Sequence, residues 1–229
     1  MPLLGEQEQR IVRERLATLT RDVEAVLFTD TSTIITPGKE PCVYCKETEQ
    51  LLKELEALTD KLHLTIYNLA LPEGKAKAQE MGVEAAPTII LREKGSDATN
   101  LRYRGIPAGY EFASLLEDIE MLGRDGHGLP DEVVQALNAL PSPVRMQVFV
   151  TPTCPYCPAA VRVAHRFAYA SPKVVGEMIE AQEFPKLSDR YGIHGVPDTV
   201  INEGAARVLG AQPVSAFLEA VQKAAVPAS

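Results

Sequence analysis

Apolar and polar positions along this chain predict short helices and strands that alternate, and the same order of elements occurs twice. Each pass reads helix, strand, helix, strand, helix, then two strands joined by a tight turn, then a last helix. The first pass is expected at residues 6–20, 23–28, the stretch after Cys42, 62–69, 72–81, 88–91, 101–104 and 110–122. The second pass is expected at residues 129–140, 144–150, 159–170, 174–180, 185–191, 199–201, 207–209 and 214–225.

Marker residues of the two passes stay nearly in register, which indicates an internal duplication. A first cysteine recurs after 112 residues, a proline before a strand after 110, and a glycine after a strand after 105: Cys42 and Cys154, Pro87 and Pro197, Gly105 and Gly210. The shrinking spacing indicates shorter loops in the second copy. The first copy also carries an insertion of about ten residues around 31–40.

We therefore expect an α/β protein of two similar units, residues 1–123 and 124–229. The glycine-rich stretch 123–128 is the expected junction, because glycine and polar residues favour turns. Strands that alternate with helices pair in parallel, and the later hairpin adds antiparallel pairing. Each unit should hold a mixed four-stranded sheet flanked by helices.

Composition narrows the partners and the setting. The 229 residues are 45% hydrophobic, and the net charge of −8 argues against nucleic acid or an anionic membrane as the main partner. The charged N-terminus lacks the apolar core of a signal peptide, and no apolar run approaches the ~20 residues of a membrane span. A cytoplasmic protein is expected.

All four cysteines lie in two Cys-x-x-Cys pairs, each placed between an apolar strand and a helix: Cys42 with Cys45, and Cys154 with Cys157. The start of a helix offers free backbone N–H groups and the positive end of its dipole, which favour a thiolate. The first cysteine of each pair precedes the helix and is expected to be the exposed nucleophile. The second, inside the helix, is expected to resolve the mixed disulfide.

Zinc binding is the main alternative for these cysteines, and an inert buried role is another. Two Cys-x-x-Cys pairs supply the four thiolates of a structural zinc site. However, 108 residues separate Cys45 from Cys154, far more than in usual zinc sites, and each pair lies in its own repeat. We expect no metal site and no cofactor besides the two redox-active disulfides.

Pro87 and Pro197 each lie 40–45 residues after the first cysteine of their unit, just before an apolar strand. Most X–Pro bonds are trans, but the shared position in both repeats favours cis bonds here. The backbone of Ala86 or Val196 is then expected to pair with a bound peptide.

Two further pairs of matching positions bear on the sites. Tyr44 and Tyr156 fill the same spacer position between the cysteines and are expected to flank the bound substrate. Asp198 follows Pro197 where the first copy has Thr88. The two sites are therefore expected to differ in charge.

The order strand, Cys-x-x-Cys, helix, strand, helix, proline, hairpin and helix resembles the thioredoxin fold. The spacer in Cys154-Pro155-Tyr156-Cys157 is similar to that of glutaredoxins. Two such units in tandem resemble the protein disulfide oxidoreductases, or glutaredoxin-like proteins, of thermophilic archaea and bacteria. The resemblance implies two tandem thioredoxin-fold units that reduce, form or isomerise protein disulfides.

By the same resemblance, an acid at the end of the strand after the cysteine-bearing helix assists proton transfer at the resolving cysteine. The matching residue is Glu180, in Met178-Ile179-Glu180-Ala181. The first unit has Asn68 or Leu69 near that place. The second site is therefore expected to be the main reductase.

Two other functions stay open. The N-terminal part of bacterial alkyl hydroperoxide reductase flavoproteins also resembles a thioredoxin-fold pair, which favours electron transfer to a peroxide-reducing system. A non-catalytic peptide-binding module is the other alternative. Because no Gly-x-Gly-x-x-Gly nucleotide fingerprint is present, electrons are expected from a partner, either a thioredoxin-reductase-like flavoenzyme or glutathione.

Overall fold

Contacts divide the chain into two compact units. The computed structural model describes residues 2–32, 42–124 and 126–225. The first unit consists of residues up to 99, 103–106 and 119–124, and the second of 100–102, 107–118 and 126–225. The stretch 107–118 thus belongs to the second unit by its contacts, although it precedes the glycine-rich stretch. The boundary between residues 123 and 124 stays a prediction about the sequence repeat.

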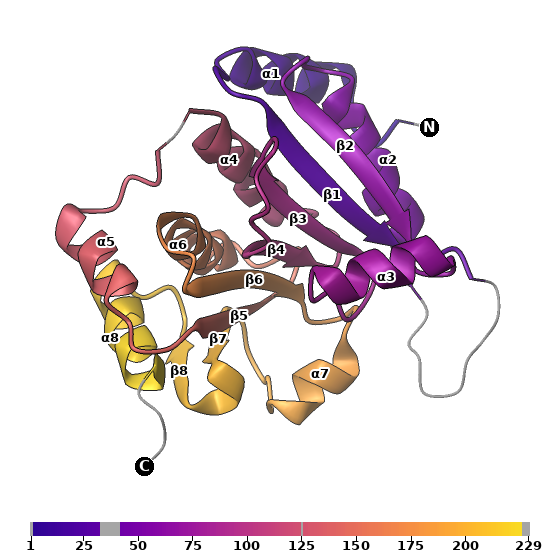
Figure 1. Cartoon of the computed structure of the whole chain (residues 1–229). Helices are drawn as coiled ribbons and strands as arrows, with labels where there is room; N and C mark the ends of the chain where they lie inside the picture. The colour runs from indigo at the N-terminus through magenta and orange to yellow at the C-terminus, as the bar shows by residue number, and fades with distance from the viewer. Residues whose placement is uncertain (1, 33–41, 125, 226–229) are drawn as a thin grey trace. The chain divides into compact units, whose positions relative to one another are not determined.

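The first pass of the chain forms the elements expected of it (Figure 1). They are α1 (Glu6–Leu16), β1 (Val23–Thr29), α2 (Cys45–Glu56), β2 (Leu62–Asn68), α3 (Pro72–Glu80), β3 (Thr88–Glu93), β4 (Leu101–Arg104) and α4 (Glu111–Arg124). α1 ends at Leu16 rather than Thr20. The amides of Thr18 and Leu19 bond carbonyls three residues back, which tightens the chain into a turn before β1.

The strand before the first cysteine pair lies inside its sheet. The strand order is β2-β1-β3-β4, with β2 parallel to β1 and β3 antiparallel to it. Val26 of β1 pairs with Thr65 on one side and with Ile90 on the other. Six of the seven β1 residues are buried, as the apolar run predicted.

The second pass repeats this plan. Its elements are α5 (Asp131–Asn138), β5 (Val144–Val150), α6 (Cys157–Ala170), β6 (Val174–Glu180), α7 (Pro185–Arg190), β7 (Asp198–Ile201), the short 3₁₀ helix η1 (Asn202–Gly204), β8 (Ala206–Leu209) and α8 (Val214–Ala225). The strand order is β6-β5-β7-β8, with β6 parallel and β7 antiparallel to β5. The mixed parallel and antiparallel pairing predicted for the four strands of each pass is confirmed.

Gly82 and Gly192 end α3 and α7 at the same point of the two copies. Their φ angles of 63° and 59° lie in the left-handed region that glycine adopts without steric cost. In both cases the next amide bonds a carbonyl five residues back, as at many helix ends. The chain therefore enters both proline loops in the same way.

The α-helices of the described residues are short. They are between 6 and 14 residues long. α2 buries Leu52 and Leu55, and α6 buries Val161 and Phe167. No helix in the part of the chain that the structure describes is long and apolar enough to cross a membrane.

Candidate active site

The second cysteine pair lies at the start of α6, as predicted. Cys154 and Cys157 form a disulfide, with their Cα atoms 5.5 Å apart. α6 begins at Cys157, and the N–H of this residue donates to Cys154 Sγ at 3.1 Å. This amide has no partner within the helix, so its bond stabilises negative charge on Cys154. Both residues are buried, Cys157 fully and Cys154 with 7% exposure, so Cys154 is the less enclosed of the two rather than the exposed residue that was expected.

The loop that ends at Pro197 lies against this outer sulfur. The Val196–Pro197 bond is cis, as predicted, and the carbonyl oxygen of Val196 is 3.8 Å from Cys154 Sγ. Tyr156, in the spacer, exposes 70% of its surface. The substrate-binding roles of Pro197, Val196 and Tyr156 stay predictions.

Glu180 ends β6 beside Val150, the last residue of β5 before the cysteine loop. Its side chain is buried, and Oε2 accepts the N–H of Glu183 at 2.6 Å. Oε1 has no hydrogen-bond partner among the described residues. Burial raises the pKa of Glu180, which favours a carboxyl that holds a proton. Its role in proton transfer stays a prediction.

Glu111, the first residue of α4, is a buried carboxyl that the sequence prediction missed. It is 1% exposed, and neither oxygen has a hydrogen-bond partner within the described chain. Burial raises the pKa of Glu111 to about 7; the nearby Ser114 hydroxyl, which lies beyond hydrogen-bond geometry, opposes the rise, as do His165 and Arg162, whereas Asp118 adds to it. The sequence did carry a signal: Glu111 precedes Leu115 by four residues, which puts an acid on the apolar stripe of the helix.

The start of α4 lies against the loop that carries the second cysteine pair. The Tyr110 N–H donates to the carbonyl oxygen of Pro152 at 3.0 Å, and Pro152 precedes Cys154 by two residues. Further along the helix, Asp118 Oδ2 lies 2.5 Å from His165 Nδ1 of α6. Glu111 therefore lies one residue from a backbone contact with the cysteine loop.

The first cysteine pair has the same frame but a different hydrogen bond. Cys42 and Cys45 form a disulfide with Cα atoms 5.5 Å apart, and α2 begins at Cys45. The N–H of Asp30 donates to Cys45 Sγ at 3.1 Å, so this bond stabilises charge on the inner sulfur. Cys42 is half-buried, and the spacer residues Val43 and Tyr44 are exposed.

The remaining predictions for the first site concern its proline loop, its spacer and its insertion. The Ala86–Pro87 bond is cis, as expected. The substrate-binding roles of Ala86, Pro87 and Tyr44 stay predictions. The insertion predicted around residues 31–40 lies almost wholly outside the described residues.

Strand register identifies the first-unit counterpart of Glu180. Asn68 pairs with Thr29 at the end of β1, as Glu180 pairs with Val150 at the end of β5. Asn68 Oδ1 accepts the N–H of Ala70 at 2.9 Å, which fixes the turn after β2. An amide does not exchange a proton at neutral pH, so the first unit has no acid at this position.

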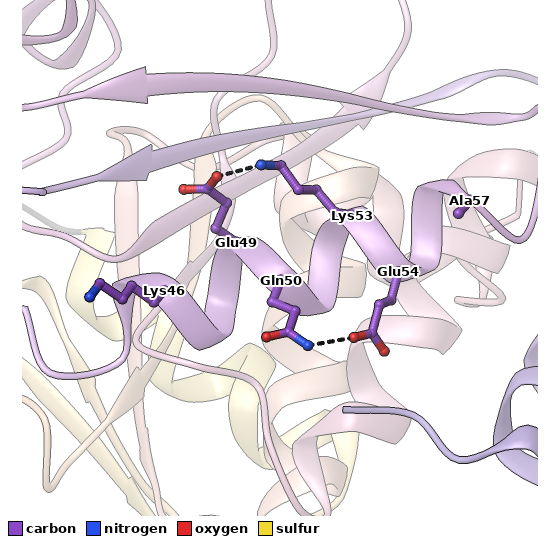
Figure 2. Close-up of a pocket in the computed structure, with 6 residues that line it drawn as sticks. All are labelled: Lys46, Glu49, Gln50, Lys53, Glu54 and Ala57. Atoms are coloured by element: carbon purple, nitrogen blue, oxygen red, sulfur yellow. Dashed lines mark hydrogen bonds and ion pairs between the residues drawn. The ribbon is translucent and has the colours of Figure 1, made fainter. Parts of the chain in front are cut away.

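A surface pocket lies along α2, downstream of the first pair (Figure 2). Its volume is about 370 Å³, and it is lined by Lys46, Glu49, Gln50, Lys53, Glu54 and Ala57. Four of these side chains bond one another across single helix turns, Lys53 to Glu49 at 2.6 Å and Gln50 to Glu54 at 2.8 Å. The lining includes no cysteine and no loop proline, so we assign the pocket no part in the chemistry.

Comparison with known proteins finds relatives that match parts of this chain. A family model described as a thioredoxin domain matches residues 144–223. Thioredoxin of Methanocaldococcus jannaschii is 41% identical over 83 residues, which are 36% of this chain and 96% of that protein. An alkyl hydroperoxide reductase protein of Xanthomonas campestris is 25% identical over 157 residues. That match covers 69% of this chain but 27% of the relative, so the chain spans about a quarter of its length.

Two solved structures match nearly the whole chain. A protein disulfide oxidoreductase from Aeropyrum pernix superposes with a TM-score of 0.85 and 34% identity, covering 96% of this chain and 93% of that one. An alkyl hydroperoxide reductase structure from Enterococcus faecalis gives a TM-score of 0.83 and 27% identity, covering 95% and 99%. Both relatives therefore share the tandem arrangement of the two units.

Proposed function

Because this chain belongs to the tandem thioredoxin-fold family of protein disulfide oxidoreductases, we propose that it exchanges electrons with protein disulfides mainly through Cys154 and Cys157. One observation supports this most directly. Cys154 Sγ accepts the amide N–H of Cys157 at 3.1 Å and lies 3.8 Å from the Val196 carbonyl oxygen. The amide stabilises the attacking thiolate, and the loop offers backbone to which an extended peptide pairs.

The reaction proceeds through a mixed disulfide. The Cys154 thiolate attacks one sulfur of the substrate disulfide, and the other substrate sulfur leaves and takes up a proton. Cys157 then loses its proton and attacks Cys154 Sγ, which restores the enzyme disulfide and releases the second substrate thiol. Two electrons and two protons pass from the dithiol to the substrate. Oxidation of a dithiol substrate runs the same steps in reverse.

The proton of Cys157 needs an internal acceptor, because this residue is fully buried. Glu111 is the acceptor that we favour, since its pKa of about 7 matches neutral conditions and its neighbour Tyr110 bonds the backbone of the cysteine loop. Glu180, with its raised pKa and one unbonded oxygen, is the second. Both belong to the second unit.

We propose that the first pair carries out the same exchange, but that its inner sulfur rather than its outer one is stabilised as a thiolate. The Asp30 N–H stabilises a thiolate on Cys45, the sulfur that leaves when a reductant attacks Cys42. A stabilised leaving thiolate speeds reduction of the first disulfide, which suits entry of electrons from a donor. The exposed side chains of Val43 and Tyr44 supply apolar surface for that donor.

The proposed partners follow from this chemistry. Substrates are protein disulfides or dithiols, and the donor is a thioredoxin-reductase-like flavoenzyme or glutathione. We propose no bound cofactor, and no nucleic acid or membrane partner. The proposed setting is the cytoplasm, where reductants keep such cysteine pairs cycling.

Reduction of insulin in the presence of dithiothreitol tests the proposal. We expect Cys154→Ser to abolish most of the activity and Cys42→Ser to retain most of it. A Cys154→Ser protein that reduces insulin at the wild-type rate would refute the assignment of the second site. Loss of activity only in the double variant would show that the sites are redundant. Binding of unfolded insulin without any turnover would favour a non-catalytic peptide-binding module.

A second candidate function is electron transfer to a peroxide-reducing partner. It is favoured by the match of this chain to the alkyl hydroperoxide reductase structure over 95% of its length. By the resemblance, the thioredoxin-fold part of alkyl hydroperoxide reductase flavoproteins keeps only one Cys-x-x-Cys pair, so the two pairs of this chain favour the main proposal. Transfer from the reduced chain to a peroxiredoxin disulfide that is much faster than transfer to insulin would reverse this preference.

A further inference from the structure

Arg207, on β8, holds both ends of the loop that lies against the second cysteine pair. Its Nε donates to Asp198 Oδ1 at 2.8 Å, and its Nη2 bonds Oδ2 of the same carboxylate. From the same guanidinium, Nη1 donates to the carbonyl oxygen of Tyr191 at 3.0 Å and Nη2 to that of Gly192 at 3.2 Å. The loop from Tyr191 to Asp198 therefore begins and ends on one side chain.

The pair of Arg207 and Asp198 is a strong one. Asp198 is 2% exposed, and the guanidinium meets its two oxygens with two nitrogens. Bidentate arginine–carboxylate hydrogen bonds are stronger and more directional than single ones, and a lysine cannot make them. Loss of the arginine would leave a buried carboxylate without its countercharge, which is costly.

The middle of the loop has less support. His194 and Gly195 are exposed, and nothing lies within 4 Å of the place where a Cβ on Gly195 would be. The carbonyl oxygen of Pro197 accepts the N–H of Gly210 at 2.9 Å. The position of Val196 beside the outer sulfur thus depends largely on how the two ends are fixed.

The first unit fixes its proline loop differently, which provides an internal control. Thr88 stands in place of Asp198, and its hydroxyl donates to the carbonyl oxygen of Ala85 at 2.7 Å. An arginine is also used there, but Arg104 pairs with Glu84, in the middle of the loop, at 2.7 Å. Because Thr88 carries no carboxylate, the bond between an arginine and the residue after the cis proline belongs to the second loop.

We propose that Arg207 and Asp198 are positioning residues that set the affinity of the second site for protein disulfides, an inference that rests on the proposed function. The hydrogen bonds described above join Arg207 to Asp198 and to the loop backbone, not to the reacting sulfurs. They fix the backbone of Val196, along which an extended substrate segment pairs. A small disulfide has no such segment, so its reduction does not depend on this backbone.

The kinetic test uses the Cys42→Ser protein, in which only the second site turns over. Arg207→Ala is expected to raise the KM for insulin roughly tenfold, equivalent to about 1.4 kcal/mol of binding, with kcat nearly unchanged. Reduction of hydroxyethyl disulfide should stay at the rate of the parent. Arg207→Lys should recover part of the affinity, and the matched control Arg104→Ala should change neither substrate. An equal loss for both substrates, or no change for insulin, would overturn the proposal.

Amide hydrogen exchange supplies a readout that does not need turnover. The Ile193 N–H bonds the carbonyl oxygen of Ser188 at 3.0 Å within the clamped loop. Its exchange should quicken in Arg207→Ala but not in Arg104→Ala, while amides of β5 stay protected. Unchanged exchange in an active enzyme would overturn only the role of Arg207. Failure of the parent protein to reduce either disulfide would overturn the proposed function and the role in affinity with it.

Discussion

Replacement of Glu111 by glutamine tests the proton pathway of the second site and carries a measurable stability change. The pKa of Glu111 rises from 4.5 to about 7 on folding, because burial disfavours the charged form. Between these values the unfolded chain loses the proton while the folded protein keeps it. At about 1.4 kcal/mol per pKa unit, the ionised carboxyl costs roughly 3 kcal/mol of folding free energy above pH 7.

The sign of the stability effect follows directly. In the wild type this residue makes the free energy of unfolding fall as the pH rises from about 4.5 to 7, and the fall is complete above pH 7. Glu111→Gln cannot ionise and loses this dependence. In urea titrations, the stability of the variant relative to the wild type should therefore increase by about 3 kcal/mol from pH 4.5 to pH 8.

Whereas Glu111→Gln is expected to gain relative stability at high pH, its activity should fall. In the Cys42→Ser background, Glu111→Gln is expected to slow insulin reduction at pH 7 by roughly 10²-fold, the lower range for a positioned acid or base. The inflection of the rate near pH 7 should disappear. Glu180→Gln, with one oxygen already bonded to the Glu183 amide, should have a smaller effect. The reasoning fails if Glu111→Gln keeps the rate and inflection of its parent while Glu180→Gln loses both.

Two further substitutions probe how the stretch 107–118 supports the second site. Gly109 has φ of 60°, and a Cβ there would overlap the carbonyl of Pro152, so Gly109→Ala should lose more than about 2 kcal/mol of stability and most second-site turnover. Gly95→Ala, also at positive φ but in open space, should cost only about 1 kcal/mol and leave activity intact. Asp118→Leu should lose about 1–3 kcal/mol by urea titration, since it leaves Nδ1 of the buried His165 without its carboxylate partner. Recovery is expected when His165→Leu is added; no measurable loss would contradict a buried hydrogen bond.

Local patterns in the sequence predicted most of the fold and both cysteine turns. Prolines and glycines at similar distances from Cys42 and Cys154 indicated the loops, because their backbone preferences hold whatever surrounds them. Side-chain partners were harder to predict. The hydrogen bond from the Asp30 N–H to Cys45 Sγ joins residues fifteen apart across an insertion, and no local pattern in the sequence predicts it.

Contacts between distant segments also decided which acids matter. Strand register was needed to choose Asn68 over Leu69 as the counterpart of Glu180, since a shift of one residue turns a side chain to the other face. Glu111 falls within the helix predicted at residues 110–122, for which the sequence predicts no role at the cysteine pair. Its place near the cysteine loop depends on the contact of its neighbour Tyr110 with Pro152, 42 positions further along the chain.

The grouping of residues 107–118 with the second unit bears on how such a protein can be divided or recombined. A fragment that begins at residue 124 would contain both cysteines of the second pair, yet it would lack Glu111 and the carboxylate that accompanies His165. Duplication supplied two copies, but the opening half of one helix now serves the other copy. A recombination event that exchanged only the repeat would leave this half-helix behind. The segment that must be transferred together to keep the second site intact is therefore longer than the sequence repeat.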